Sequence, residues 1–276
     1  MCLISRQKLL FLRVNKNIML QPDIYKSNII GPIHSRRLGI SLGVNLLPDN
    51  GKVCSFDCLY CECGYNEDHR GGHLPNADIV LEQLAHKLEE MKTAGEGLDV
   101  ITFAGNGEPT MHPQFAYVID ETLKLRDEFF PNAKVSVLSN ATRMSVPEVH
   151  NALLKVDNNI LKIDGGKDET VRMIDRPVDK GYNLHDVVEG MKAFKGELIV
   201  QTMFVRGEHD GLRIDNTLPD EVALWMDYMR QIKPRQIMVY SLDRPTPEQK
   251  LERVTKEEMA ELVKPLIEEG FNISIA

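Results

Sequence analysis

The feature that most constrains the fold is a regular alternation of two kinds of segment along the chain. From residue 40 onward, short β-rich apolar runs alternate with longer stretches of helical periodicity. This alternation is typical of repeated βα units whose strands form a parallel sheet. We count six such units, and the sequence therefore predicts an α/β fold.

The expected strands are Ser41 to Leu47, Val100 to Ala104, Lys134 to Ser139, Ile160 to Asp164, Leu198 to Val205 and Gln236 to Leu242. The expected helices are Asp78 to Thr93, Pro113 to Phe129, Val146 to Leu154, Leu184 to Lys195, Pro219 to Ile232 and Thr255 to Glu269. Right-handed βα crossovers place the carboxyl ends of all parallel strands at one rim. We therefore expect the chemistry in the loops that follow the strands.

Composition indicates an ordinary globular chain of 276 residues, with 42% hydrophobic and 27% charged side chains. Charged residues interrupt every apolar run before it reaches the roughly 18 residues that a transmembrane helix needs. The basic start lacks a small-residue cleavage site, so we expect a cytoplasmic protein and no membrane partner. Residues 1–26 are predicted to be an N-terminal extension that can be mobile, and residues 27–276 to be one domain.

Charge is unevenly distributed along the sequence. Residues 1–53 contain eight Lys/Arg and two Asp/Glu, whereas the whole chain has a net charge of −8. An acidic body argues against broad nucleic-acid binding, although Arg36 and Arg37 offer a local patch for a phosphate-bearing partner.

Three cysteines, Cys54, Cys58 and Cys61, form a Cys-x3-Cys-x2-Cys motif after the first expected strand. Three thiolates on one loop can hold three irons of a 4Fe-4S cluster and leave the fourth iron open. The alternative is a zinc site completed by His69 and His73. Cys63 follows Cys61 too closely to join the same cluster, so we interpret it and the distant Cys2 as free thiols.

The loop after the second expected strand reads Gly105-Asn106-Gly107-Glu108-Pro109. Its glycines permit unusual dihedral angles and close backbone approach, and Glu108 offers a carboxylate suited to a cationic ammonium. Taken alone, the segment could equally be a turn. Ser139 and Asn140 close the third expected strand, where they can cap the next segment or bind a ribose or carboxylate.

Polar residues also mark the later strands. Lys162 and Asp164 are two positions apart, so they project to the same face of their strand, while the alternative is an exposed salt bridge at its end. Gln201 is expected to share a face with Met203 and Val205. Ser241 lies near the end of the sixth expected strand.

The cysteine motif resembles the signature of the radical S-adenosylmethionine (SAM) superfamily, in which an aromatic residue, here Tyr60, precedes the last cysteine. The resemblance implies a partial (β/α)6 TIM-like barrel in which SAM chelates the open iron. An electron then splits SAM to a 5′-deoxyadenosyl radical that abstracts hydrogen from substrate. The Gly105–Pro109 segment resembles the superfamily's Gly-Gly-Glu-Pro element, with Asn106 interrupting the glycines.

By this resemblance Cys54, Cys58 and Cys61 are the metal ligands, and Lys162 and Asp164 are the catalytic candidates. The remaining candidates are expected to bind the cofactor: Tyr60, Gly105, Asn106, Gly107, Glu108, Pro109, Ser139, Asn140, Gln201 and Ser241. A low-potential electron donor such as flavodoxin or ferredoxin is implied as a partner.

A second resemblance lies in residues 31–45 and in Leu242-Asp243-Arg244-Pro245. These segments are similar to a group of small iron-sulfur oxidoreductases related to the wyosine-forming tRNA enzymes. The chain lacks enough unassigned cysteines for the second cluster of the wyosine-type enzymes. The sequence therefore favours a one-cluster enzyme acting on tRNA or a nucleotide-bearing molecule. The alternatives are a peptide-modifying or enzyme-activating radical SAM protein and a non-catalytic zinc- or cluster-binding regulatory module.

Overall fold

The computed structural model describes residues 24–35, 39–66 and 72–276. Cys2, Arg36, Arg37 and His69 therefore lie outside the described residues, as does most of the predicted extension. No helix in the described ranges is long and apolar enough to cross a membrane.

The main sheet has eight strands in the order β1-β2-β3-β4-β5-β6-β9-β11. They are β1 (Ile29–Ser35), β2 (Gly39–Val44), β3 (Val100–Phe103), β4 (Lys134–Ser139), β5 (Asn158–Lys162), β6 (Ile199–Met203), β9 (Gln236–Tyr240) and β11 (Ile273–Ile275). Only the pairing of β1 with β2 is antiparallel in this sheet. The six predicted parallel strands are therefore confirmed, and β11 adds a seventh.

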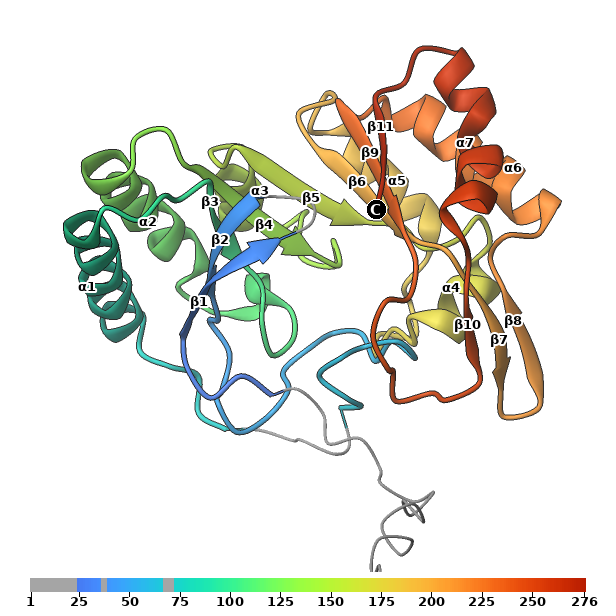
Figure 1. Ribbon diagram of the computed structural model, residues 1–276. Coiled ribbons are helices and arrows are strands. Elements are labelled where there is room, and N and C mark those ends of the chain that lie inside the picture. The colour runs from blue at the N-terminus through green and yellow to red at the C-terminus, as the bar shows by residue number, and fades with distance from the viewer. Residues whose placement is uncertain (1–23, 36–38, 67–71) are drawn as a thin grey trace, which may run out of the picture.

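The sheet curves with its helices on the outer face (Figure 1). The helices are α1 (Ala77–Ala94), the 3-10 turn η1 (Pro109–Met111), α2 (Phe115–Phe129), α3 (Pro147–Leu153), α4 (Asp168–Ile174), α5 (Leu184–Lys192), α6 (Pro219–Ile232) and α7 (Lys256–Glu268). Apolar side chains of the strands and helices form one continuous core between the two layers. The predicted partial (β/α)6 barrel is confirmed.

The predicted strand Leu198 to Val205 is wrong in its second half. β6 ends at Met203, and Val205 begins a separate sheet with the order β10-β7-β8. Its strands are β7 (Val205–His209), β8 (Leu212–Asp215) and β10 (Leu251–Arg253). The Asn216 side chain makes the break, because it accepts a hydrogen bond from Val205 N at 2.8 Å and donates to Met203 O at 2.7 Å. Val205 therefore does not share the face of Gln201.

The boundaries of the fourth predicted strand also differ. β5 ends at Lys162, and Asp164 lies in the segment that follows it. The predicted shared side of these two residues is nonetheless observed, because Lys162 Nζ lies 3.2 Å from Asp164 Oδ2. Leu161 and Ile163, which alternate with them, are buried in the core.

Candidate functional site

The loop that follows β2 carries the three predicted cluster ligands. In Figure 1 this loop gathers with the β7–β8 hairpin at the lower edge of the barrel, where the parallel strands end. Three backbone hydrogen bonds of 2.9 Å join the loop to residues 174–178: Leu59 N to Ile174 O, Asp57 N to Asp175 O and Val178 N to Ser55 O. The cysteine loop is therefore held against the segment that follows β5 and α4.

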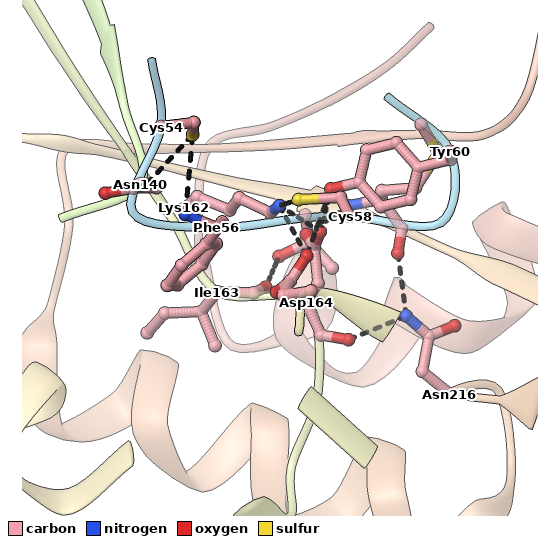
Figure 2. Close-up of polar contacts among 12 residues, drawn as sticks. Cys54, Phe56, Cys58, Tyr60, Asn140, Lys162, Ile163, Asp164 and Asn216 are labelled. Atoms are coloured by element: carbon pink, nitrogen blue, oxygen red, sulfur yellow. Dashed lines mark hydrogen bonds and ion pairs between the residues drawn. The ribbon is translucent and has the colours of Figure 1, made fainter. Parts of the chain in front are cut away.

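The cysteine sulfurs receive hydrogen bonds from their surroundings (Figure 2). Cys58 is buried, and its Sγ lies 3.0 Å from Lys162 Nζ. Cys54 Sγ accepts from Phe56 N at 3.4 Å and from Asn140 Nδ2 at 3.7 Å. Hydrogen-bond donors and cations around a sulfur favour the thiolate, which is the form that binds iron. The donor set therefore fits a cluster held by cysteine.

The thiols differ in acidity before any metal binds. Burial, with Glu108 nearby, raises the pKa of Cys54 to about 12, and burial also raises the pKa of Cys58. The hydrogen bond from Cys63 lowers the pKa of Cys61 to about 6. Cys63 forms no disulfide, and its Sγ lies 3.4 Å from Gly105 O. Cluster loading must therefore release protons from buried thiols.

Within the part of the chain that the structure describes, no three His, Cys, Asp or Glu side chains converge on a point suited to a single metal ion. His73, one of the two histidines of the zinc alternative, belongs to no such group. The three cysteines of the cluster motif are no exception, so this finding bears equally on zinc and on a cluster.

A buried network of charged and hydroxyl groups lies beside Cys58. Lys162 Nζ is 3.2 Å from Asp164 Oδ2 and 2.5 Å from Asp175 Oδ1. The Tyr60 hydroxyl donates to Asp164, and Asp164 Oδ1 accepts from Met203 N at 2.7 Å. The Asp164 side chain is fully buried, so the alternative of an exposed salt bridge is wrong.

The network shifts the acidity of its members. Burial alone would lower the pKa of Lys162, but Asp164 and Asp175 outweigh this effect and the pKa is raised. Burial raises the pKa of Asp175 to about 7, against the opposing effect of Lys162. Lys162 is therefore held as a cation between carboxylates and a cysteine sulfur.

Glu108 connects the glycine-rich loop to the end of β4. Its Oε1 accepts hydrogen bonds from Thr110 N at 3.1 Å, Thr110 Oγ1 at 2.6 Å and Ser139 Oγ at 2.8 Å, while Oε2 accepts from Asn140 N at 2.7 Å. The residue is 2% exposed. Pro109 begins η1, for which Glu108 is the N-cap. The carboxylate thereby fixes Ser139 and Asn140 as well as its own loop.

Asn140 extends this connection to the cysteine loop. Its Nδ2 donates to Ser55 Oγ at 2.9 Å, and its Oδ1 accepts from Thr142 N and Thr142 Oγ1. The structure thus brings together the ends of β2, β3 and β4 through Asn140, Glu108 and the cysteine loop.

The two glycines of the motif allow the loops to approach each other closely. Gly107 has φ of 132° and forms an isolated parallel bridge with Val53, just before Cys54. A Cβ at Gly107 would lie 1.9 Å from Val53 O. Gly105 has φ of 149°, and a Cβ there would lie 2.4 Å from Asn45 Oδ1. A side chain at either glycine would therefore collide with neighbouring atoms, so the segment is more than an ordinary turn.

Asn106, which separates the two glycines, uses its side-chain amide for structural hydrogen bonds. Its side chain is buried and bonds both backbone groups of Tyr25, accepting from N at 2.9 Å and donating to O at 2.9 Å. It also donates to Pro48 O at 2.7 Å, and its backbone N donates to Asn45 Oδ1. The Asn106 side chain is therefore committed to the chain's own backbone and ties the segment at Tyr25 to the motif.

The last two candidates lie on the later strands. Gln201 is 8% exposed and is the register partner of Lys162 in the β5–β6 pair. Ser241 Oγ donates to Phe204 O at 2.7 Å and accepts from Val254 N at 2.8 Å. Ser241 thus connects β9 to the break after β6, whereas Gln201 lies level with the charged network.

Sequence reasoning missed three residues that organise the site: Lys52, Asp175 and Asn216. Lys52 is buried in the cysteine loop, where Nζ donates to Gly64 O at 2.8 Å. Asn216 Nδ2 donates to Asp164 O at 2.8 Å. A usable signal was present for Lys52, which lies two positions before Cys54, but Asp175 and Asn216 are brought to the site by tertiary contacts alone.

Among curated proteins, a UPF0026 protein of Synechocystis sp. is 31% identical over 231 residues, covering 80% of this chain and 78% of that protein. GTPase Obg of Brachyspira hyodysenteriae is 29% identical over 250 residues, covering 90% of this chain and 34% of that protein. This chain thus spans about a third of the Brachyspira protein, and the activity in that name is not transferred to it.

Two solved structures share the fold. SuiB of Streptococcus suis bound to the precursor peptide SuiA has a TM-score of 0.61 at 12% identity, covering 85% of this chain and 48% of SuiB. TYW1 with a lysine-pyruvate adduct bound has a TM-score of 0.57 at 15% identity, covering 84% of this chain and 74% of TYW1. At these identities the likeness shows the fold alone.

Residues 51–215 match the Radical SAM superfamily. The match spans the three cysteines, the Gly105–Pro109 motif and the network at Lys162. A non-catalytic zinc module would need neither the motif nor the network. The chain therefore belongs to the radical SAM superfamily, whose members are enzymes that use a 4Fe-4S cluster and SAM.

Proposed function

We propose that this radical SAM enzyme abstracts hydrogen from a nucleotide-bearing substrate, with tRNA as the first candidate. The observation that supports the radical chemistry is the convergence of the cysteine loop, Glu108 and Asn140 at one rim. When bound, the cluster and SAM supply a low-potential electron and a carbon-centred radical. The residues of the chain must hold these groups, orient the substrate and exclude water.

Each polar group at the rim has a task in this proposal. Cys54, Cys58 and Cys61 hold the cluster. Glu108 Oε2 accepts one hydrogen bond from the chain, so a second lone pair is left for the SAM ammonium. Ser139 and Asn140, fixed by Glu108, form the neighbouring part of the SAM site.

The opposite side of the site belongs to the later strands. Tyr60 is proposed to contact SAM through its ring, because its hydroxyl is engaged with Asp164. Asp164 and Gln201 border the space where substrate would meet SAM, and Ser241 supports this wall through Phe204. Lys162 remains a catalytic candidate of this proposal, although its nearest described partners are a cysteine and two carboxylates.

The substrate class rests on the sequence similarity of residues 31–45 to the wyosine-related group. The TYW1 likeness is compatible with this class but carries the fold alone. Peptide modification is the second candidate, and the likeness to SuiB with its precursor peptide is compatible with it in the same way.

Deuterium transfer separates the two classes. Small RNA and protein fractions from cells grown in deuterated medium would each be incubated with reconstituted enzyme, SAM and dithionite. We expect deuterium in 5′-deoxyadenosine with the RNA fraction, and its loss after ribonuclease treatment. Deuterium from the protein fraction alone, lost after protease treatment, would overturn the nucleotide proposal in favour of a peptide.

The electron is proposed to come from a flavodoxin or ferredoxin, because the superfamily needs a low-potential donor. Free thiols at Cys54, Cys58, Cys61 and Cys63 suit a reducing compartment, so the cytoplasm is the proposed location. Pull-down with the flavodoxin of the same cell, followed by transfer of reducing equivalents to the cluster, tests the donor directly.

A further inference from the structure

Two buried lysines lie beside the cysteines of the cysteine loop. The Lys52 side chain is 1% exposed and the Lys162 side chain is 13% exposed. Lys52 belongs to the loop itself, while Lys162 ends β5. Lysine is almost never this buried unless it is paired. Two such residues beside one ligand loop indicate a requirement for positive charge at that place.

Lys162 is held in one orientation. Its ammonium lies 3.0 Å from Cys58 Sγ, 5.2 Å from the centroid of the Phe56 ring and 4.8 Å from that of the Tyr60 ring. Both rings belong to the cysteine loop, so the loop surrounds the cation with two aromatic faces and one sulfur (Figure 2). Asp164 and Asp175 complete its contacts. The amine is therefore directed at the ligand loop.

Lys52 makes a separate set of contacts within the loop. Nζ donates to Gly64 O at 2.8 Å and lies 3.5 Å from Asp57 Oδ1. Asp57 is itself shared, because Oδ1 accepts from Asn66 N at 2.7 Å and Oδ2 lies 3.4 Å from Arg176. One shared carboxylate does not neutralise Lys52 and Arg176 together, so positive charge is left for the neighbouring sulfurs.

We infer that Lys52 and Lys162 set the reduction potential of the cluster by stabilising its reduced form. This inference rests on the proposed ligation of the cluster by Cys54, Cys58 and Cys61. A 4Fe-4S cluster with three thiolates is anionic, and reduction adds one more negative charge. Nearby cations and hydrogen bonds to the ligand sulfur favour that added charge, most strongly where water is excluded. Both lysines thus act on the cluster through their charge, and Lys162 also acts through its hydrogen bond to Cys58.

Two substitutions at and beside Lys162 should shift the reduction potential of the cluster in opposite directions. Lys162→Met removes the cation and the donor to Cys58 but keeps the length of the side chain. Asp175→Asn, compared with wild type at a pH where Asp175 is ionised, removes a neighbouring anion. A purely structural role would move the potential in no particular direction, whereas this inference predicts a fall in the first variant and a rise in the second.

The measurement is a potentiometric titration of the reconstituted enzyme, followed by the EPR signal of the reduced cluster. At the wild-type midpoint we expect the ratio of reduced to oxidised cluster to fall about tenfold in Lys162→Met, which is about 59 mV for one electron. Lys52→Met should lower the midpoint potential in the same way, and Lys162→Arg should have a midpoint potential close to that of the wild type. The matched control is Lys134→Met, at an exposed position where β4 begins, and this variant should leave the midpoint potential unchanged.

Iron-loaded Lys52→Met and Lys162→Met variants with wild-type midpoints would overturn this inference alone. Wild-type protein that takes up no iron would instead contradict the proposed function. Should the Met variants not retain iron, pulsed EPR of wild-type enzyme containing lysine labelled with ¹⁵N at Nζ decides the question. We expect ¹⁵N coupling to the reduced cluster whose strongest component disappears in Lys162→Arg, because Lys162 Nζ lies 3.0 Å from Cys58 Sγ. Absence of any ¹⁵N coupling in the wild type would overturn the inference.

Discussion

The Glu108 carboxylate lies 2.7 Å from the backbone nitrogen of Asn140 and so joins the ends of two neighbouring parallel strands, β3 and β4. Through the Asn140 side chain, the same connection reaches Ser55 in the cysteine loop. A single buried acid thus aligns the cluster loop with the loop proposed to bind SAM.

Glu108→Gln should weaken this connection. One carboxylate oxygen becomes an NH2 donor that faces other donors, and an unsatisfied buried group costs about 1–3 kcal/mol. We expect the free energy of unfolding of the apo protein, measured in urea, to fall by about this amount. Exposed Glu89→Gln is the matched control. Equal stability of the two variants would show that the Glu108 bonds contribute nothing.

Truncation of Glu108 should affect SAM binding and cluster loading to different extents. Glu108→Ala should weaken SAM binding to the reconstituted enzyme more than it lowers the iron content, because the proposed partner of Glu108 is the SAM ammonium. Isothermal titration with SAM and iron analysis on the same sample measure both quantities. A parallel loss of iron and SAM affinity would indicate that Glu108 has only a structural role.

Asn106→Ala should release the segment at Tyr25 from the glycine motif. The variant leaves the Tyr25 backbone and Pro48 O without the amide that bonds them, at a cost of about 1–3 kcal/mol. Faster hydrogen exchange of residues 24–28 and a lower unfolding free energy are expected. Asn272→Ala, an exposed residue near β11, is the control. Unchanged exchange near Tyr25 would contradict the proposed connection.

Gly107→Ala should be far more harmful than Gly95→Ala. Gly95 has φ of 71°, in the left-handed region where alanine costs about 1–2 kcal/mol, whereas Gly107 has φ of 132°, in a region used essentially by glycine alone. A Cβ at Gly95 meets nothing within 4 Å, whereas at Gly107 it would lie 1.9 Å from Val53 O. We expect Gly107→Ala to lose the bridge before Cys54 and to bind less iron. Similar unfolding free energies for the two variants would show that the close approach at Gly107 is dispensable.

Local sequence signals predicted the repeated elements well. Lys134–Ser139 and Pro219–Ile232 match the predicted strand and helix at both ends. The expected helix from Thr255 begins with a capping box, in which Thr255 and Glu258 form reciprocal bonds. These elements depend on periodicity, β-propensity or capping within a few residues, which the sequence displays directly.

Elements that depend on distant partners were not predicted. The strand break after Met203 is made by Asn216, and β1 contains a Gly-Pro pair that argues against a strand although pairing with β2 imposes one. The short α4, β10 and β11 were missed for the same reason, since their contacts are tertiary. At the site, Asp175 reaches Lys162 from the end of α4, a relationship that residue spacing does not encode.

The central claim is that Cys54, Cys58 and Cys61 hold a cluster that lets the enzyme split SAM. The most direct test is anaerobic reconstitution, iron analysis and measurement of 5′-deoxyadenosine after reduction with SAM present. We predict about four irons per chain and slow 5′-deoxyadenosine release in the wild type, with the release abolished in Cys58→Ala and retained in Cys63→Ala. Stoichiometric zinc without iron, or undiminished 5′-deoxyadenosine from Cys58→Ala, would contradict the account.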